Sequence, residues 1–312
     1  MRGKEIAQSD VLTTITQNYT FDGCVLDDAI PAVPITKKEG KYYVFGEEEL
    51  YTWADDFGEE EEANILKMRA TTATYESKGH GLKSPISNLN VRIEDPAVQQ
   101  EVRKTEKIAR ALRIAREVRF AALLDATVGT TSVDSGDKSN AWATAASGTP
   151  LADLLAMKQD VRNACGVNPN LAIIPMQCAE AMIACEEVQK RIYYNRENVA
   201  DFDTLPPNIL GMRVLTPMQM KLGEQTVTTH VPATVSSKST VWGDHVYLLY
   251  VATTPAIDEP SAMYRFQLVP EFTRRLEAPE LGIEGSFYVQ TAYHQVLKVV
   301  HAYAVGRIQN VV

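Results

Sequence analysis

The chain is poor in cysteine, which limits the small stabilising frameworks it can have. Only four of its 312 residues are cysteines. They form no CxxC pair, and none lies at zinc-finger spacing from a histidine. We therefore expect neither a disulfide framework nor a structural metal site, and predict small buried thiols. The four are Cys24, Cys165, Cys178 and Cys185.

Long apolar runs are also missing. The longest, Val246 to Ala252, is far shorter than the roughly 20 residues with which a helix crosses a bilayer. The first residues, Met1 to Glu5, lead into no apolar signal core. We therefore expect a protein of the cytosol that is neither exported nor embedded in a membrane.

Motifs that indicate catalysis are absent as well. The sequence has no P-loop, no GxGxxG after a strand, no GxSxG and no HExxH pair. His245 beside Asp244 could act as a base and its orienting carboxylate, but no nucleophile stands at a known spacing from them. We predict no catalytic site, no cofactor and no metal, and keep a cytosolic enzyme that uses Asp244 and His245 as an alternative.

What the chain does contain is an ordinary globular composition with one unusual cluster of charge. Hydrophobic residues make up 45% and charged residues 23%, values typical of a soluble protein with a sizeable core. The net charge is −9, and nine acidic residues lie between Glu47 and Glu62 with no lysine or arginine among them. Without that segment, 31 acidic residues balance 31 basic ones. The segment therefore predicts an acidic element that projects from a neutral body.

Strand patterns on both sides of the acidic segment indicate a long β-hairpin. Lys41 to Phe45 reads as one strand, and the alternation in Ile65 to Tyr75 reads as the returning strand. Glycine and proline at positions 79, 81 and 85 are expected to close the hairpin. The four consecutive glutamates at 59–62 lack the spacing of a calcium loop, so a solvated tip is favoured over a cation site.

A long amphipathic helix is predicted from Pro96 to Ala126. Asp95 before Pro96 is a good N-cap and first-turn pair. Arg116 and Arg119 fall within the apolar stripe, where a charge needs a carboxylate partner or a way out to water. The opposite face carries a basic row, which is either a solvated surface or a sequence-blind contact with nucleic acid. That row is Arg103, Lys107 and Arg110.

The rest of the chain predicts a linker and then a mixed α/β unit. Residues 129–148 are mostly small and are expected to form the linker, and Thr149 before Pro150 is another helix start. A buried strand and a helix should follow at 171–174 and 176–192. Later strands are expected at 212–215, 240–252, 263–269 and from 285 to the C-terminus.

In this order, the elements resemble the major capsid protein family of tailed bacteriophages, over nearly the whole chain. Several segments are similar to the family locally, and their order and spacing carry the resemblance. They are Tyr75 to Asp95, Trp142 to Gly166, Asn168 to Pro175, Ile209 to Val214, and Val241 to Asp244.

The resemblance implies an α+β fold with named parts. Residues 1–40 would form an N-terminal arm and first peripheral strand, and 41–90 an extended hairpin loop. Residues 91–148 would form part of a peripheral domain, with a spine helix at 96–126 and the linker. Residues 149–265 would form an axial domain, and 266–312 would return to strands of the peripheral domain.

The resemblance also implies a function. Copies would form pentamers and hexamers that close an icosahedral shell around double-stranded DNA, with a separate scaffolding protein, a portal protein and, in some members, a decoration protein as partners. The shell would assemble in the host cytoplasm and become the virion capsid. We further hypothesise that acidic loop residues meet a basic surface of the next subunit, or else that the basic helix face meets DNA. A bacterial encapsulin, which encloses enzymes, is the alternative. The interface candidates are Glu59, Glu60, Glu61, Glu62, Lys67 and Arg69.

Overall fold

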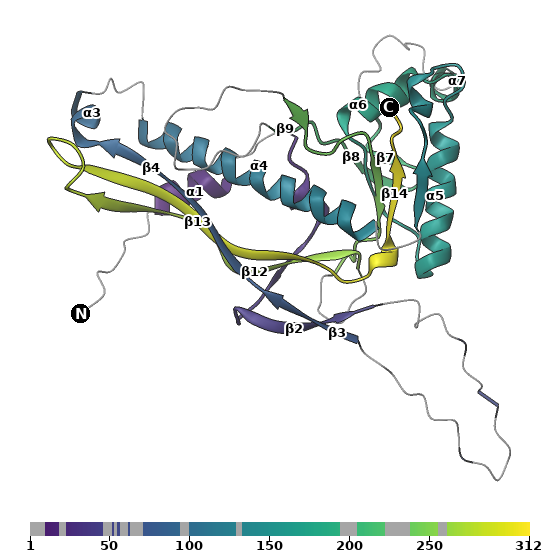
Figure 1. Cartoon of the computed structure of the whole chain (residues 1–312), viewed down its shortest axis with the longest axis horizontal. Helices are drawn as coiled ribbons and strands as arrows, with labels where there is room; N and C mark the ends of the chain where they lie inside the picture. Colours follow the sequence, from purple (N-terminus) through teal and green to yellow (C-terminus); the bar gives the residue numbers. More distant parts are fainter. Residues whose placement is uncertain are drawn as a thin grey trace.

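The computed structural model contains two large β-sheets joined by one long helix, together with two small two-stranded sheets (Figure 1). It describes residues 10–18, 23–45, 52, 55–56, 62, 71–93, 100–128, 133–193, 205–221, 238–254 and 261–312. No helix within this described part of the chain is long and apolar enough to cross a membrane.

The first sheet is long, narrow and four-stranded, in the order β1-β12-β13-β4. β12 (Met263–Ala278) and β13 (Ser286–Val299) pair antiparallel along their whole length. β1 (Ala32–Pro34) and β4 (Lys78–Ser87) form the two edges. Helix α4 (Gln100–Val128) lies along this sheet, where Ile108 and Leu112 pack on Tyr293, and α1 (Asp10–Asn18) packs beside it.

The second sheet is six-stranded and mixed, in the order β5-β14-β11-β6-β8-β7. Its buried strands, β6 (Leu171–Ile173) and β11 (Val246–Leu249), are apolar at every position, as expected for strands covered on both faces. Helices α5 (Pro150–Cys165), α6 (Met176–Ala184) and α7 (Glu186–Tyr193) surround it. The remaining strands are β5 (Asp134–Asp137), β7 (Asn208–Ile209), β8 (Met212–Leu215) and β14 (Val305–Gln309).

Short elements connect these layers. Helix α2 (Leu26–Ala29) lies against α4, and α3 (Asn88–Ile93) follows β4. β9 (Met220–Lys221) pairs with β10 (Ser239–Thr240), and two 3-10 turns span Ala141–Ala143 and Ala302–Ala304.

A separate two-stranded hairpin base projects beside the long sheet (Figure 1). β2 (Glu39–Val44) pairs antiparallel with β3 (Thr71–Glu76), from Glu39 opposite Glu76 to Val44 opposite Thr71. The acidic segment lies between these strands, and Glu62 is exposed. Glu59, Glu60, Glu61, Lys67 and Arg69 lie outside the described residues.

Several predicted helix boundaries are confirmed and one is wrong. Pro150 begins α5, and Gly166 ends it with a left-handed φ of 74°. The predicted start at Asp95 and Pro96 lies outside the described residues, whereas the C-terminal end of α4 is found at Val128. The helix predicted for 176–192 is two helices, because Cys185 takes an extended conformation between α6 and α7.

The predicted end of the hairpin at positions 79–85 is wrong. Gly79, Gly81 and Pro85 lie inside β4, which pairs with β13. An edge strand tolerates proline, because the missing N–H can face outward. Glycine at 79 leaves room for a neighbour, since a Cβ there would lie 2.8 Å from Cε1 of His294. Residues 78–90 therefore belong to the long sheet and α3 rather than to the extended loop.

The predicted linker and the predicted destination of the C-terminal strand are also corrected. Trp142 is buried, and its indole N–H donates to Asp153 at 2.9 Å. β5, within the same stretch, pairs with β14. β14 pairs in turn with β11, so residues 305–309 complete the six-stranded sheet rather than the long one. Alternation predicted a strand here but did not identify its partner.

The close packing of α5 on β14 gives a direct test of this corrected topology. A Cβ on Gly306 would lie 2.6 Å from both Sδ of Met157 and Cγ2 of Val161. We predict that Gly306→Ala lowers the free energy of unfolding of the isolated chain by about 1–3 kcal/mol, through overpacking. Urea unfolding measures it. The control, Ala156→Ser, adds one atom on the exposed face of α5 and should cost under about 0.7 kcal/mol. Equal midpoints for both variants would contradict the assignment.

Candidate subunit-contact site

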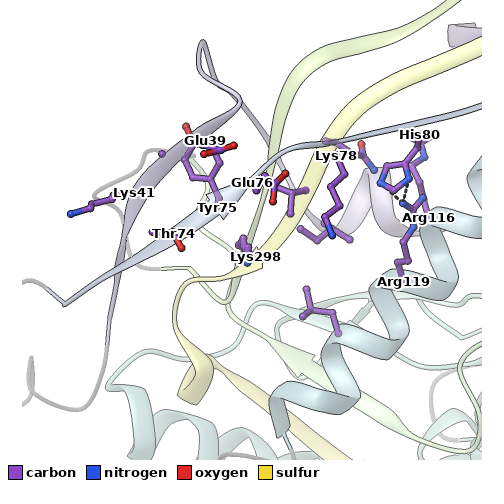
Figure 2. A pocket seen from close by; sticks show the side chains of 15 residues that line it. Glu39, Lys41, Thr74, Tyr75, Glu76, Lys78, His80, Arg116, Arg119 and Lys298 are labelled. Atoms are coloured by element: carbon purple, nitrogen blue, oxygen red, sulfur yellow. Dashed lines mark hydrogen bonds between the residues drawn. The ribbon is translucent and has the colours of Figure 1, made fainter.

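A groove opens between the hairpin base, the end of β13 and helix α4 (Figure 2). Its volume is about 960 Å³, within the range of clefts that bind sizeable ligands. Its lining includes six cationic or potentially cationic side chains and two carboxylates. Four of the six, together with one amide, define what we call the basic groove. They are Lys78, His80, Arg119, Lys298 and Gln295.

The lysines of the basic groove carry uncompensated charge. Figure 2 shows Lys78 and Lys298 beside the groove, with Lys41 at the outer rim. Among the described residues, no carboxylate lies within 4.0 Å of Lys78 or Lys298. Two carboxylates, Glu39 and Glu76, also border the groove, and that of Glu76 lies 3.5 Å from Lys38. The groove therefore attracts anionic groups.

Arg119 is held rigidly at one wall. Its Nη2 donates to the hydroxyl of Tyr293 at 2.7 Å, its Nε donates to the carbonyl of Ala115 at 3.0 Å, and its Nη1 lies 2.8 Å from Nδ1 of His80. Burial and the neighbouring Arg119 charge lower the pKa of His80 to about 4. His80 is therefore neutral at pH 7 and accepts a hydrogen bond from the guanidinium.

An unmet hydrogen-bond acceptor lies in the same groove. Gln295 is 4% exposed, and its Oε1 has no hydrogen-bond partner within the part of the chain that the structure describes. A buried acceptor without a donor costs about 1–3 kcal/mol. The basic groove thus combines positive charge with an unmet, buried acceptor on one of its lining residues.

Arg116 also lines the groove and lies one turn before Arg119 on α4. Its guanidinium lies 3.3 Å from Glu271 of β12 and 3.6 Å from Asp27 of α2. Asp27 also pairs with Arg265. Of the two outcomes expected for Arg116, a carboxylate partner or a way out to water, the structure shows the carboxylate partner. Arg119 is satisfied differently, by a phenol, an imidazole and a carbonyl.

Glu117 was not predicted from the sequence. Its carboxylate accepts hydrogen bonds from the backbone N–H groups of Val25 and Leu26 and from the indole of Trp242, at 3.1–3.2 Å. Burial raises its pKa to about 7, although these three donors oppose the rise. One side chain of α4 thus joins the segment before α2 to the second sheet's core.

The basic helix row predicted from the sequence lies outside this groove. Arg103, Lys107 and Arg110 are exposed on α4 and do not line the cleft. The structure thus shows two basic surfaces where the sequence indicated one. The groove escaped prediction because its residues come from four segments far apart in the chain.

The alternative catalytic pair has structural contacts. Asp244 accepts a hydrogen bond from Gln177, and its backbone carbonyl accepts from Val311 at 3.0 Å. Nδ1 of His245 accepts from the backbone N–H of Asn310 at 3.2 Å. Both residues hold the C-terminal segment in place. No cluster of three potential metal ligands occurs among the described residues.

Comparison with known proteins agrees with the resemblance in the sequence. No family model matches the chain. It is 22% identical over 240 residues to a protein named major capsid protein from Pseudomonas phage JBD67, covering 77% of this chain and 75% of that one. A phage-related protein of Bordetella bronchiseptica superposes with a TM-score of 0.71 at 16% identity, covering 99% of this chain and 98% of that one.

The capsid of cyanophage P-SCSP1u superposes with a TM-score of 0.62 at 10% identity, covering 93% of this chain and 92% of the other. The chain has the phage capsid-protein fold. An encapsulin of Synechococcus elongatus has the same fold, with a TM-score of 0.53 at 10% identity over 100% of this chain and 92% of that one. The capsid-protein fold is thus common to viral and bacterial shells.

Glu117 gives a pH-dependent prediction. Because its pKa is about 7 in the folded chain, against 4.5 as the ordinary value, the folded state binds the extra proton between these pH values. Its contribution to stability is present below pH 4.5 and is lost as the pH rises to about 7, by about 3 kcal/mol. We predict that Glu117→Gln, measured against wild type, becomes relatively more stable by up to this amount over the same range.

Urea unfolding of the subunit at pH 4.5, 6 and 8 measures this difference. Glu186→Gln, at an exposed glutamate of α7, is the control and should show no comparable gain. A stability difference between Glu117→Gln and wild type that is constant with pH would contradict the assignment.

Proposed function

We propose that this chain is the major capsid protein of a tailed bacteriophage and self-assembles, as pentamers and hexamers, into an icosahedral shell around double-stranded DNA. The observation that carries the proposal is the capsid-protein fold along nearly the whole chain, together with the similarity to a phage protein named major capsid protein. A role in shell geometry also agrees with the structural contacts of Asp244 and His245.

The domain assignment belongs to the same proposal. The long sheet with α4 would form the peripheral domain, and the six-stranded sheet with α5, α6 and α7 the axial domain around which rings form. The pairing of β14 with β11 supports placing residues 305–312 in the axial domain. A single sequence that serves pentamers and hexamers must tolerate several local angles, which suits a projecting hairpin better than a broad rigid interface.

Partners follow from this role. A separate scaffolding protein would guide assembly in the host cytoplasm, a portal protein would occupy one vertex, and a decoration protein would bind outside in some shells. Acidic loop residues would contact a neighbouring subunit, together with Lys67 and Arg69. The candidate acidic residues are Glu59, Glu60, Glu61 and Glu62. Exposed ion pairs contribute only about 0–1 kcal/mol each, so this contact would set register and salt sensitivity.

The exposed row on α4 would face the packaged DNA. Arg103, Lys107 and Arg110 present positive charge without interleaved aromatic residues, so contact with phosphate would be independent of base sequence. We predict that reversing all three to glutamate lowers the DNA content of particles while empty shells still form. The DNA-to-protein ratio of purified particles measures this. Unchanged DNA content would contradict the lumen-facing role.

An encapsulin-type shell is the second candidate, supported by the fold shared with the Synechococcus protein. We predict that the purified chain forms closed particles of one or a few discrete sizes in negative-stain electron microscopy. Particles from phage-infected cells should contain nuclease-resistant DNA. Closed particles filled with protein cargo would favour the encapsulin instead, and a small soluble oligomer in place of particles would contradict both.

A further inference from the structure

We infer that the basic groove is the receptor for the acidic segment, residues 47–62, of a second copy of this chain. The inference rests on the proposed function, since it needs copies packed side by side in a shell. It names a receptor different from the exposed row on α4. The groove, rather than the helix row, would then fix how each hairpin lies on its neighbour.

The acidic segment and the basic groove carry opposite charge. The acidic segment has nine carboxylates and no lysine or arginine. The basic groove has Lys78 and Lys298 without a carboxylate within 4.0 Å among the described residues, and Arg119 bonded there only to neutral groups. Every copy carries both surfaces. The acidic segment of one copy therefore attracts the groove of the next at every equivalent contact.

The uncharged groups of the groove also suit the acidic segment. The buried Oε1 of Gln295 lacks a donor within the described part of the chain, and in the proposed contact a backbone N–H of the entering segment would supply one. Tyr75, Leu123 and Val296 add apolar surface to the lining. The acidic segment contains Leu50, Trp53 and Phe57 among its carboxylates, so it matches the lining in apolar character as well as in charge. A bare phosphate ion would use the lysines but would leave the Gln295 acceptor unmet.

The direction of the hairpin strands favours a second copy over the same chain. The groove is lined by the near end of the hairpin base, at Glu39 to Lys41 and Thr74 to Glu76. From there the pairing continues to Val44 opposite Thr71, beyond the residues that line the groove. The nine steps from Glu62 to Thr71 span at most about 30 Å, so the segment reaches the groove of its own chain only by reversing the direction of the strands. The experiment therefore has to distinguish binding to the groove of a second copy from binding to the groove of the same chain.

Disulfide trapping between different chains is the direct test. One chain carries Lys298→Cys and another carries Glu60→Cys; they are co-expressed, assembled and oxidised, and then run on a non-reducing gel. We expect a covalent dimer of the two chains in the mixture and not in particles of either variant alone. The matched control pairs Glu60→Cys with Arg103→Cys on the α4 row and should give no dimer.

Absence of the dimer from closed particles overturns the inference. The inference is also overturned if the disulfide forms only within a single chain that carries both Lys298→Cys and Glu60→Cys. The acidic segment would then occupy the groove of its own chain. Wild-type chain that forms no closed particles contradicts the proposed function itself, which keeps the two failures distinct.

Charge reversal provides the second test, without cysteine. Lys78→Glu with Lys298→Glu should lower the NaCl concentration at which half the particles dissociate, or prevent assembly, by placing like charges together. Adding lysine at positions 59–62 of the same chain should restore at least half of the wild-type particle yield. The control combines the same four lysines with Arg103→Glu and Lys107→Glu, and should stay unassembled. Rescue by the control but not by the groove variant would show that the exposed row on α4 is the receptor. That result would overturn the inference.

Discussion

The buried charges at the middle of α4 hold the two halves of the molecule in one arrangement. Arg116 faces the long sheet through Glu271, and the adjacent Glu117 accepts from Trp242 in the core of the second sheet. Both also bind the segment around α2, through Asp27 and the N–H groups of Val25 and Leu26. Removing one member of such a buried set leaves the others uncompensated, at about 3–5 kcal/mol for a charge pair.

The helix gives these contacts their reach. Its 29 residues make a rod about 43 Å long. The N-terminal half packs on the long sheet through Ile108 and Leu112, whereas Phe120 and Leu124 are fully buried in the core of the six-stranded sheet. A rigid rod shared by two cores fixes the position of every group attached to it. Arg119 is one turn beyond Arg116, so the charge pairs of Arg116 also set one wall of the groove.

Local elements were predictable from the sequence because their signals are local. Thr149 and Pro150 identified the start of α5, and the apolar pattern at 212–215 located β8 with its observed ends. Arg116 was recognised as needing a carboxylate partner or a way out to water, because a charge on an apolar stripe is costly wherever the helix packs. The overall fold came from the order of such elements and their resemblance to a known family.

Long-range partnerships were not predictable in the same way. Alternation in residues 305–309 indicated a strand but is equally compatible with either sheet, and β4 contains the glycines and proline that usually end a strand. The groove combines 78–80, Arg119 and 295–298, and no periodicity links them. For the proposed contact, the sequence suggested an acidic segment and a basic surface. It selected the exposed row on α4, because a helical face can be read from spacing and a groove cannot.

In the proposed assembly, the acidic segment of one chain lies in the basic groove of another. A cryo-electron microscopy reconstruction of the assembled particle tests it most directly. We expect density traceable to residues 47–62 of a neighbouring subunit to fill the groove, within hydrogen-bonding distance of Gln295 and beside Lys78 and Lys298. A groove that is empty in the closed shell, or filled by the same subunit's own segment, would contradict it.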